Sequence, residues 1–244
     1  MCKKRKIDTD KTIHVVTANS FITACGLDKI SLKARKLLYI AIAQCKMTDN
    51  EFYEYSIKVS DFSKMMEIDA SNVYKEADKI TDELMRGFVK IVEKGKRKYK
   101  KYSLFSFCEC DDAKIKFKLN EDMTDFLLAL KGNFSQPLLD DFLRMKSKYS
   151  MAIWHLMQAK MNSEKPFING EPIEFDLMLD ELREVTGTQN KLKQISQFKE
   201  RVLDEAVKEI YKNCYVVIEY SNIKKGRVII GFHFKAVHGW YHKD

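Results

Sequence analysis

The spacing of apolar residues along the chain alternates between a helical and a strand period, and the same order of periods occurs twice. In the first half the pattern predicts a helix, a strand, a short helix, a long helix and a β-hairpin. These elements are expected over residues 31–45, 52–59, 60–68, 72–87 and 88–110. The second half repeats the order over residues 147–161, 172–177, 178–187, 190–213 and 215–237.

A short helix, a turn and a second helix form a helix-turn-helix, and a following β-hairpin is the wing of a winged helix. Because the pattern occurs twice, the sequence predicts an α+β fold made of a tandem pair of winged-helix domains. The expected parts are a mobile basic N-terminal arm over 1–11, one domain over 12–135 and a second over 136–244. A strand over 113–120 and a helix over 121–131 complete the first domain.

Capping residues predict where several helices begin and end. Ser31 is expected to cap the helix that follows it, and Ser60 or Asp61 to cap the short helix of the first half. Gly87 and Gly187 are expected to end the helices that precede them, since glycine is the usual residue just after a helix.

The two long helices following each turn have a clear apolar face, which should hold each of them to its domain. In the helix over 72–87 this face consists of Val73, Ala77, Ile80 and Leu84. In the helix over 190–213 it consists of Ile195, Phe198, Val202, Ala206 and Ile210. The opposite face of each helix is then available to a partner.

The overall charge indicates what kind of partner to expect. The chain has 43 Lys+Arg against 35 Asp+Glu, a net charge of +8 and a pI of about 9.0. This favours nucleic acid or an anionic membrane face, although a merely solvated basic surface would give the same totals. No apolar run approaches the roughly 20 residues of a membrane span, and no apolar segment follows the basic start as in a secretory signal. A soluble cytoplasmic protein with reduced cysteines and no membrane partner is therefore expected.

The helix over 190–213 is the predicted DNA-recognition helix. A helix fits the major groove, where Arg suits guanine, Gln suits adenine and Lys suits phosphate. The side opposite its apolar face carries Lys193, Gln194, Gln197 and Arg201. Acidic Asp204 and Glu205 follow on that side, so the contact with DNA should end near Arg201.

The corresponding helix of the first half is a weaker reader. Its candidate contacts are Ser71, Asn72, Lys75 and Lys79. Asp78 and Asp82 interrupt them, and phosphate would repel both carboxylates. Because winged helices also mediate protein contacts, the first copy is the candidate for dimerisation.

Both predicted wings have strongly basic tips, and the first is the more basic. The candidate phosphate contacts are Lys96, Arg97 and Lys98 in the first wing and Lys224, Lys225 and Arg227 in the second. Phosphate contacts supply affinity without sequence information. Double-stranded DNA is therefore the predicted partner.

The chain also resembles the plasmid replication initiators of the RepB/RepE/Pi type, which have two winged-helix domains. Segments in the family's order carry the resemblance: VVTANSFITA, ISLKARKLLYIAIAQC, YSIKVSDFSKMMEI, KYSMAIWHLMQ and QFKERVLDEAVKEIY. The last of these is the most specific, and it implies that Lys199 and Arg201 contact DNA.

The resemblance implies a mechanism that the residues alone do not predict. Such initiators bind repeated origin sites (iterons) as monomers, help to open an adjacent AT-rich segment, and recruit the host replication initiator and the replicative helicase. As dimers they often repress their own gene, and a monomer–dimer equilibrium is implied. The N-terminal domain is generally the part that dimerises and binds partners.

Two alternatives remain open at the level of sequence. A rolling-circle nuclease needs a His-x-His metal site and a tyrosine nucleophile. No His-x-His pair occurs, and only GFHFKAVHGWYH, which ends just after Tyr241, comes near. No phosphate-binding Gly-x-x-x-x-Gly-Lys-Ser/Thr loop occurs either, so no enzyme activity, cofactor or metal is expected. A winged-helix transcriptional regulator, by contrast, would bind DNA in the same way as an initiator.

Overall fold

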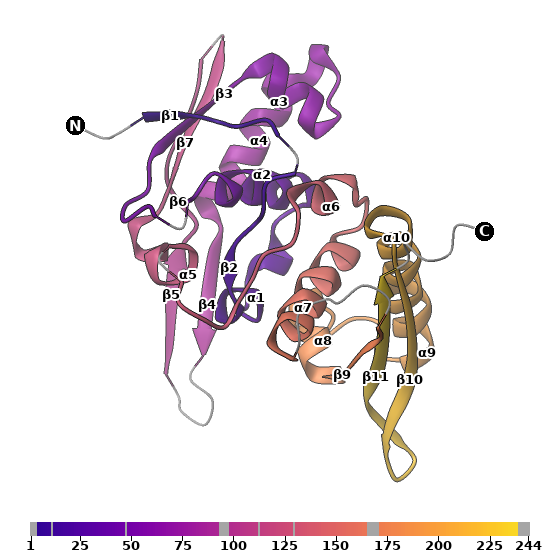
Figure 1. Ribbon diagram of the computed structural model, residues 1–244. Helices are drawn as coiled ribbons and strands as arrows, with labels where there is room; N and C mark the ends of the chain where they lie inside the picture. The colour runs from indigo at the N-terminus through magenta and orange to yellow at the C-terminus, as the bar shows by residue number, and fades with distance from the viewer. Residues whose placement is uncertain are drawn as a thin grey trace. The chain divides into compact units, whose positions relative to one another are not determined.

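The computed structural model describes residues 4–10, 12–46, 48–92, 98–111, 113–128, 130–164 and 171–238, with the backbone only for 162–164. The chain divides into two compact units, Met1–Leu143 and Arg144–Asp244 (Figure 1). The sequence placed this division at 135/136. In the structure Phe142 packs against Tyr39 with ring centroids 4.3 Å apart, which keeps the segment up to 143 with unit 1.

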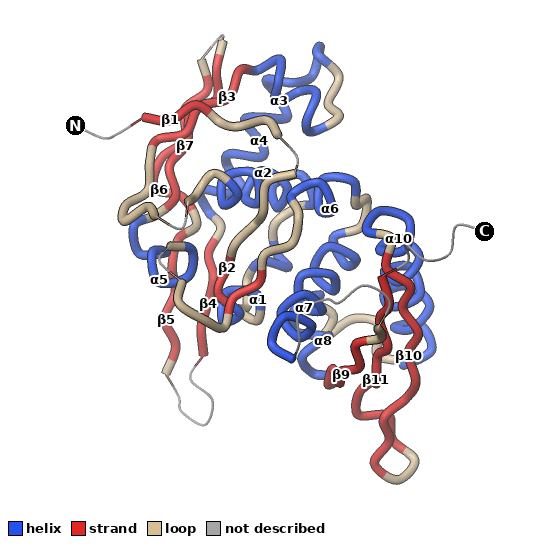
Figure 2. The backbone as a smooth tube through the Cα atoms, in the orientation of Figure 1, coloured by secondary structure: helices blue, strands red, loops and turns tan. Residues whose placement is uncertain are grey.

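Unit 1 contains the helices and strands of the first winged helix together with additional strands (Figure 2). Its helices are α1 (Asn19–Ile22), α2 (Leu32–Ala43), α3 (Val59–Met66), α4 (Val73–Arg86), α5 (Thr124–Leu127) and α6 (Leu139–Arg144). Its strands are β1 (Lys4–Lys6), β2 (Thr17–Ala18), β3 (Glu54–Lys58), β4 (Phe88–Val92), β5 (Tyr99–Ser103), β6 (Phe105–Cys110), β7 (Lys114–Leu119) and β8 (Phe134–Ser135). The helix expected over 121–131 is shorter than predicted: a 3₁₀ turn precedes α5, and α5 ends at Leu127.

The described residues of unit 1 form three separate sheets. A four-stranded sheet has the order β1-β3-β7-β6, whereas β4 pairs with β5 and β2 pairs with β8. The sequence predicted a single hairpin over 88–110, but the chain crosses from one sheet to another at Leu104. Leu104 is buried, its N–H donates to the Gly87 carbonyl, and its carbonyl accepts from Asn120 N–H. The β4–β5 pair is therefore the first wing, and β6 belongs to the body of the unit.

Residues 4–6 join the four-stranded sheet, so they do not form the mobile arm that the sequence predicted over 1–11, of which residues 1–3 and 11 lie outside the described residues. β1 pairs in parallel with β3, and Arg5 forms two hydrogen bonds to the Asp49 carboxylate at 2.8 and 3.1 Å. The guanidinium also lies 3.8 Å from the Tyr53 ring centroid. Although burial acts in the opposite direction, the bond to Arg5 holds the pKa of Asp49 below its ordinary value.

The predicted caps are only partly present. The Ser31 side chain accepts a hydrogen bond from Ala34 N–H, which confirms the cap of α2. The cap at Ser60 or Asp61 is wrong, because β3 runs directly into α3 and Val59 N–H bonds to the Ala113 carbonyl. Gly87 does follow α4, but with an extended backbone. A side chain there would lie 2.8 Å from Leu104 Cδ1, so close packing favours glycine at this position.

Unit 2 has the simpler architecture of a winged helix. Its elements are α7 (Lys148–Glu164), β9 (Ile173–Met178), α8 (Leu179–Thr186), α9 (Ile195–Phe198), a π-helical segment (Lys199–Asp204), α10 (Glu205–Cys214), β10 (Val216–Lys225) and β11 (Val228–His238). The sheet is antiparallel, with the order β10-β11-β9. Gly187 ends α8 in the left-handed conformation (φ 65°), as predicted. Among the described helices, none has the length and apolarity needed to cross a membrane.

Candidate nucleic-acid interface

The second helix of the unit 2 helix-turn-helix consists of α9, the π-helical segment and α10, and it is called the recognition helix below. It has a buried apolar side and an exposed polar side. Phe198, Val202 and Ala206 are each 0% exposed, and Ile210 continues the same buried face. Gln197 and Arg201 are exposed, as the sequence predicted. This geometry allows their side chains to reach a groove. That they contact bases remains a prediction.

Two of the predicted contacts do not lie on this helix. The sequence extended the helix from 190, but the structure begins it at Ile195, and both Lys193 and Gln194 precede it. Gln194 is the N-cap residue with an extended backbone, and Leu192 has a positive φ of 49°. Both predicted side chains are exposed, so they belong to the turn that leads into the helix. The helix over 190–194 is therefore a wrong prediction.

The helix is also irregular where the initiator resemblance is most specific. Residues Lys199–Asp204 have π-helical hydrogen bonding. Such segments are rare in proteins overall, but many of those known lie at functional sites. Lys199 is half-buried, with its Nζ 5.3 Å from the ring centroid of Tyr220 in β10. The Tyr220 hydroxyl donates a hydrogen bond to Asp204. Burial is the main cause that raises the pKa of Tyr220, and this bond is the second. Lys199 thus lies over the base of the second wing, while Arg201 is exposed.

The second wing brings its predicted basic residues to an exposed turn. Strands β10 and β11 run side by side to a tip at Gly226, whose φ of +63° suits a tight turn (Figure 1). Lys224, Lys225 and Arg227 are exposed around it. Their ammonium and guanidinium groups are therefore available to phosphates.

In unit 1 the predicted contacts separate into two groups. Lys75 and Lys79 are exposed on α4, opposite Val73, Ala77, Ile80 and Leu84, which are all buried. Ser71 and Asn72 lie in a 3₁₀ turn before α4, and the Ser71 hydroxyl donates to Asp69 at 2.6 Å. The prediction that placed Ser71 and Asn72 on the helix face is therefore wrong. Both belong to the turn that Asp69 caps.

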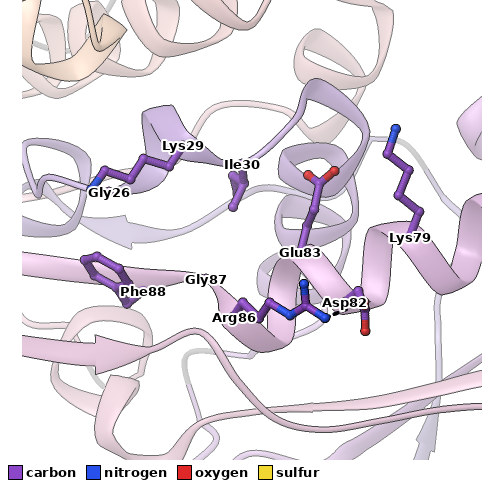
Figure 3. Close-up of a pocket in the computed structure, with 9 residues that line it drawn as sticks. All are labelled: Gly26, Lys29, Ile30, Lys79, Asp82, Glu83, Arg86, Gly87 and Phe88. Atoms are coloured by element: carbon purple, nitrogen blue, oxygen red, sulfur yellow. Dashed lines mark hydrogen bonds and ion pairs between the residues drawn. The ribbon is translucent and has the colours of Figure 1, made fainter.

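Acidic residues interrupt the α4 face, as predicted, but one of them is neutralised. Asp82 accepts a hydrogen bond from Arg86 at 2.9 Å. Figure 3 shows both residues with Lys79 along a hollow between α4 and the segment that contains Gly26 and Lys29. Glu83, which also lines the hollow, accepts a hydrogen bond from Ser31 N–H at 2.8 Å. The mixture of charges on α4 is as the sequence predicted, and a smaller part for this helix in reading DNA stays a prediction.

The first wing has a feature that the sequence analysis missed. Lysines and aromatic rings alternate on the face that carries Phe88, Lys90, Tyr99 and Lys101. Lys101 Nζ lies 4.9 Å from the Phe88 ring centroid, and Lys90 Nζ lies 4.6 Å from that of Tyr99. The feature could have been found by pairing residues 88–92 with residues 99–103 as neighbouring strands and comparing the side chains that share a face. Of the predicted tip residues, Lys98 is exposed, whereas Lys96 and Arg97 lie outside the described residues.

The described residues contain no group of three or more His, Cys, Asp or Glu side chains that could hold a metal ion. Of the histidine-rich segment, Tyr241 and His242 lie outside the part of the chain that the structure describes. His233 lies on β11, with its Nδ1 2.8 Å from Asp176 and its Nε2 3.6 Å from Glu174. The hydrogen bond to Asp176 is the main cause that raises the pKa of this imidazole, and the negative charges of Asp176 and Glu174 act in the same direction.

We expect an NMR titration to place the pKa of His233 above its ordinary value of 6.5. Asp176→Asn should return it toward that value, because the principal bond to the imidazolium is lost. Since the folded-state pKa is the higher one, the stabilising contribution is complete below the unfolded pKa and is lost as pH rises through the folded pKa. Glu174→Gln is the control and should have the smaller effect. An unshifted pKa in the unmodified protein would contradict this account.

Comparison with known proteins bears on both units. The family model described as initiator replication protein, WH1, matches residues 14–158, and the model described as initiator Rep protein, WH2, matches residues 178–236. No protein with curated annotation matches the chain.

Several solved structures are similar to this chain, among them the following two. The crystal structure of Pi initiator protein in complex with iteron DNA aligns over 94% of this chain and 98% of that chain, with a TM-score of 0.76 and 19% identity, which shows a shared fold. A selenomethionine structure of domain 2 and domain 3 of RctB covers 85% of this chain and 81% of that chain at 10% identity. Its TM-score of 0.42 is too low to support an argument. The predicted tandem pair of winged-helix domains is confirmed. Because the two family models cover most of its length in the order of its two units, the chain belongs to the family of plasmid replication initiator proteins.

Proposed function

We propose that this protein binds repeated duplex sites, or iterons, at a plasmid origin through its WH2 domain. Family membership supports the role in initiation, and the similar Pi protein was crystallised with iteron DNA. The net charge of +8 supports a nucleic-acid partner. Recognition of a site longer than one helix can cover suits a chain with two such modules.

One observation carries the proposal: the exposure of Gln197 and Arg201 opposite a fully buried anchor. Phe198 and Val202 hold the helix to the WH2 core, so the polar side can enter the major groove without unfolding anything. Arg and Gln are the side chains that pair in bidentate fashion with guanine and adenine. Lys193 and Gln194, at the entry to the helix, and Lys199 beside the wing are proposed to contact the flanking phosphates.

The WH1 domain has a different part in the proposal. Its acid-interrupted α4 supports a smaller role in reading bases and a larger one in dimerisation, while the first wing binds phosphates. Opening of the origin, recruitment of the host initiator and replicative helicase, and repression of its own gene by a dimer complete the proposed cycle. Membership of the initiator family supports these steps.

Binding of fluorescent duplexes taken from the DNA that flanks the gene tests this function. A duplex containing a tandem repeat should bind at least about 10³-fold more tightly than a shuffled duplex at physiological salt. The affinity should fall linearly with salt on logarithmic axes, because counterions are released from DNA. Equal affinity for both duplexes would contradict the proposal. Specific binding to a promoter operator alone would favour the transcriptional regulator.

Neutralising the first wing should weaken binding to every duplex alike. The double variant Lys98→Gln/Lys100→Gln removes two exposed charges, and each lost phosphate contact should flatten the salt slope by about 0.9. The preference for the repeat over shuffled DNA should stay the same, since phosphates carry no sequence information. The control Lys4→Gln/Lys114→Gln removes the same charge from exposed positions of the four-stranded sheet. An unchanged slope in the wing variant would show that the wing does not touch DNA.

A further inference from the structure

The side chain of Arg183 binds much of the turn between α8 and the recognition helix. Its Nη1 donates to the carbonyls of Thr188 and Lys191, at 2.9 and 3.0 Å. Its Nη2 donates to the carbonyls of Leu192 and Lys193, at 3.0 and 3.4 Å. One guanidinium therefore binds four main-chain oxygens of the segment that leads into the recognition helix.

The backbone of Arg183 is tied to the same turn. Thr188 N–H donates to the Arg183 carbonyl at 2.9 Å, one residue after Gly187 adopts its left-handed conformation. A buried hydrogen bond of 2.9 Å joins the hydroxyls of Thr186 and Thr188. The start of the turn is thus fixed at the end of α8, and the guanidinium fixes the remainder.

Such a clamp is needed because the turn adopts an unfavourable conformation. Leu192 has a φ of 49°, a backbone conformation that costs free energy for residues other than glycine. Such a conformation persists only where the surrounding structure holds it. The bond from Arg183 Nη2 to the Leu192 carbonyl provides one such constraint.

The clamp reaches the recognition helix itself. The guanidinium carbon of Arg183 lies 4.8 Å from the ring centroid of Phe198, which is fully buried and is the first strong anchor of that helix. Arg183 thereby joins the end of α8, the turn and the first turn of the recognition helix. A planar guanidinium can do this, whereas the point charge of lysine lacks the fork of donors.

We propose that Arg183 is a positioning residue that sets sequence discrimination without touching DNA. By fixing the turn that carries Lys193 and Gln194, it fixes how Gln197 and Arg201 enter the groove. Base contacts need accurate placement, whereas phosphate contacts tolerate displacement. Loosening the turn should therefore cost specificity and leave general affinity for DNA unchanged. This inference rests on the proposed function of WH2.

The test compares Arg183→Met and Arg183→Lys with the unmodified full-length protein on repeat and shuffled duplexes. Arg183→Met keeps the apolar stem against Phe198 and loses all four bonds, so its preference for the repeat should fall about tenfold or more. Arg183→Lys keeps the charge and should retain only part of that preference. Affinity for the shuffled duplex should stay within about twofold in both variants. Lys160→Met is the control. It removes a positive charge that pairs at 3.5 Å with Glu181, which lies in α8 as Arg183 does.

Amide hydrogen exchange of residues 188–194 supplies a second readout, since it should speed up in both variants without DNA. Parallel losses on repeat and shuffled DNA would overturn the inference, because they would mean that Arg183 contacts phosphate or supports the whole domain. An unchanged preference would overturn it as well. If Arg183→Met does not fold, the lysine variant and its exchange rates decide. Failure of the proposed function is distinguishable, since the unmodified protein would then show no preference for the repeat.

Discussion

Arg201→Ala should weaken binding to the cognate repeat by about 1–3 kcal/mol and relax the sequence requirement at one base pair. Arg201 is exposed on the side of the recognition helix opposite Phe198 and Val202, which are both fully buried. An arginine so placed pairs in bidentate fashion with the O6 and N7 atoms of guanine. The measurement is the dissociation constant for the repeat and for duplexes with each position changed in turn.

The control for this variant is Lys212→Ala, an exposed cation on α10 beyond the acidic residues where the contact should end. It should leave the preference for the repeat intact. If Arg201→Ala instead weakens repeat and shuffled DNA to the same extent, Arg201 binds phosphate. If neither affinity changes, the proposed reading side of the helix is wrong.

Phe198→Ala should lower the free energy of unfolding of unit 2 by about 3–5 kcal/mol. The Phe198 ring is 0% exposed and lies under the guanidinium of Arg183. Truncating it removes buried apolar surface and leaves a cavity at the anchor of the recognition helix. Because the chain has two units, hydrogen exchange of the β10 and β11 amides is the appropriate measurement, and exchange in unit 1 should not change.

Tyr211→Ala serves as the matched control, since Tyr211 belongs to α10 and is 56% exposed. Its effect should stay within about 0.5 kcal/mol. Similar effects of the two substitutions would mean that Phe198 does not anchor the helix. Equal acceleration of exchange in both units would mean that unit 2 does not unfold by itself.

Elements with a strong apolar period were predictable from the sequence. Val73, Ala77, Ile80 and Leu84 recur at spacings of three and four, and all four are buried on α4. The alternation of β9, with Ile173, Phe175 and Leu177 buried, is equally regular. Burial of one face is the physical cause of both patterns, so the pair of winged helices could be recognised.

The start of the recognition helix could not be predicted in the same way. Arg183 binds the carbonyls of residues 188 and 191–193, and hydrogen bonds between a helix and a turn leave no periodic pattern in the sequence. Lys193 and Gln194 were therefore assigned to a helix that begins only at Ile195. The π-helical segment escaped prediction for a similar reason, because its contacts with Tyr220 come from another element.

Contacts between distant segments also account for the differences in unit 1. β1 is a strand because it pairs with β3 and because Arg5 binds Asp49, 44 residues away. The hairpin breaks at Leu104 because that side chain packs into the core beside Gly87. The row of lysines and rings on the first wing depends on the register between β4 and β5. Local patterns indicate which segments form strands, but the choice of partner strand depends on tertiary packing.

A scan that replaces each guanine of the repeat by 7-deazaguanine, with the unmodified protein and with Arg201→Ala, tests the central claim most directly. The claim is that the exposed side of the recognition helix reads base edges. It predicts one guanine at which loss of N7 weakens binding of the unmodified protein but has no further effect on the variant. Independent, additive losses at every guanine would contradict it.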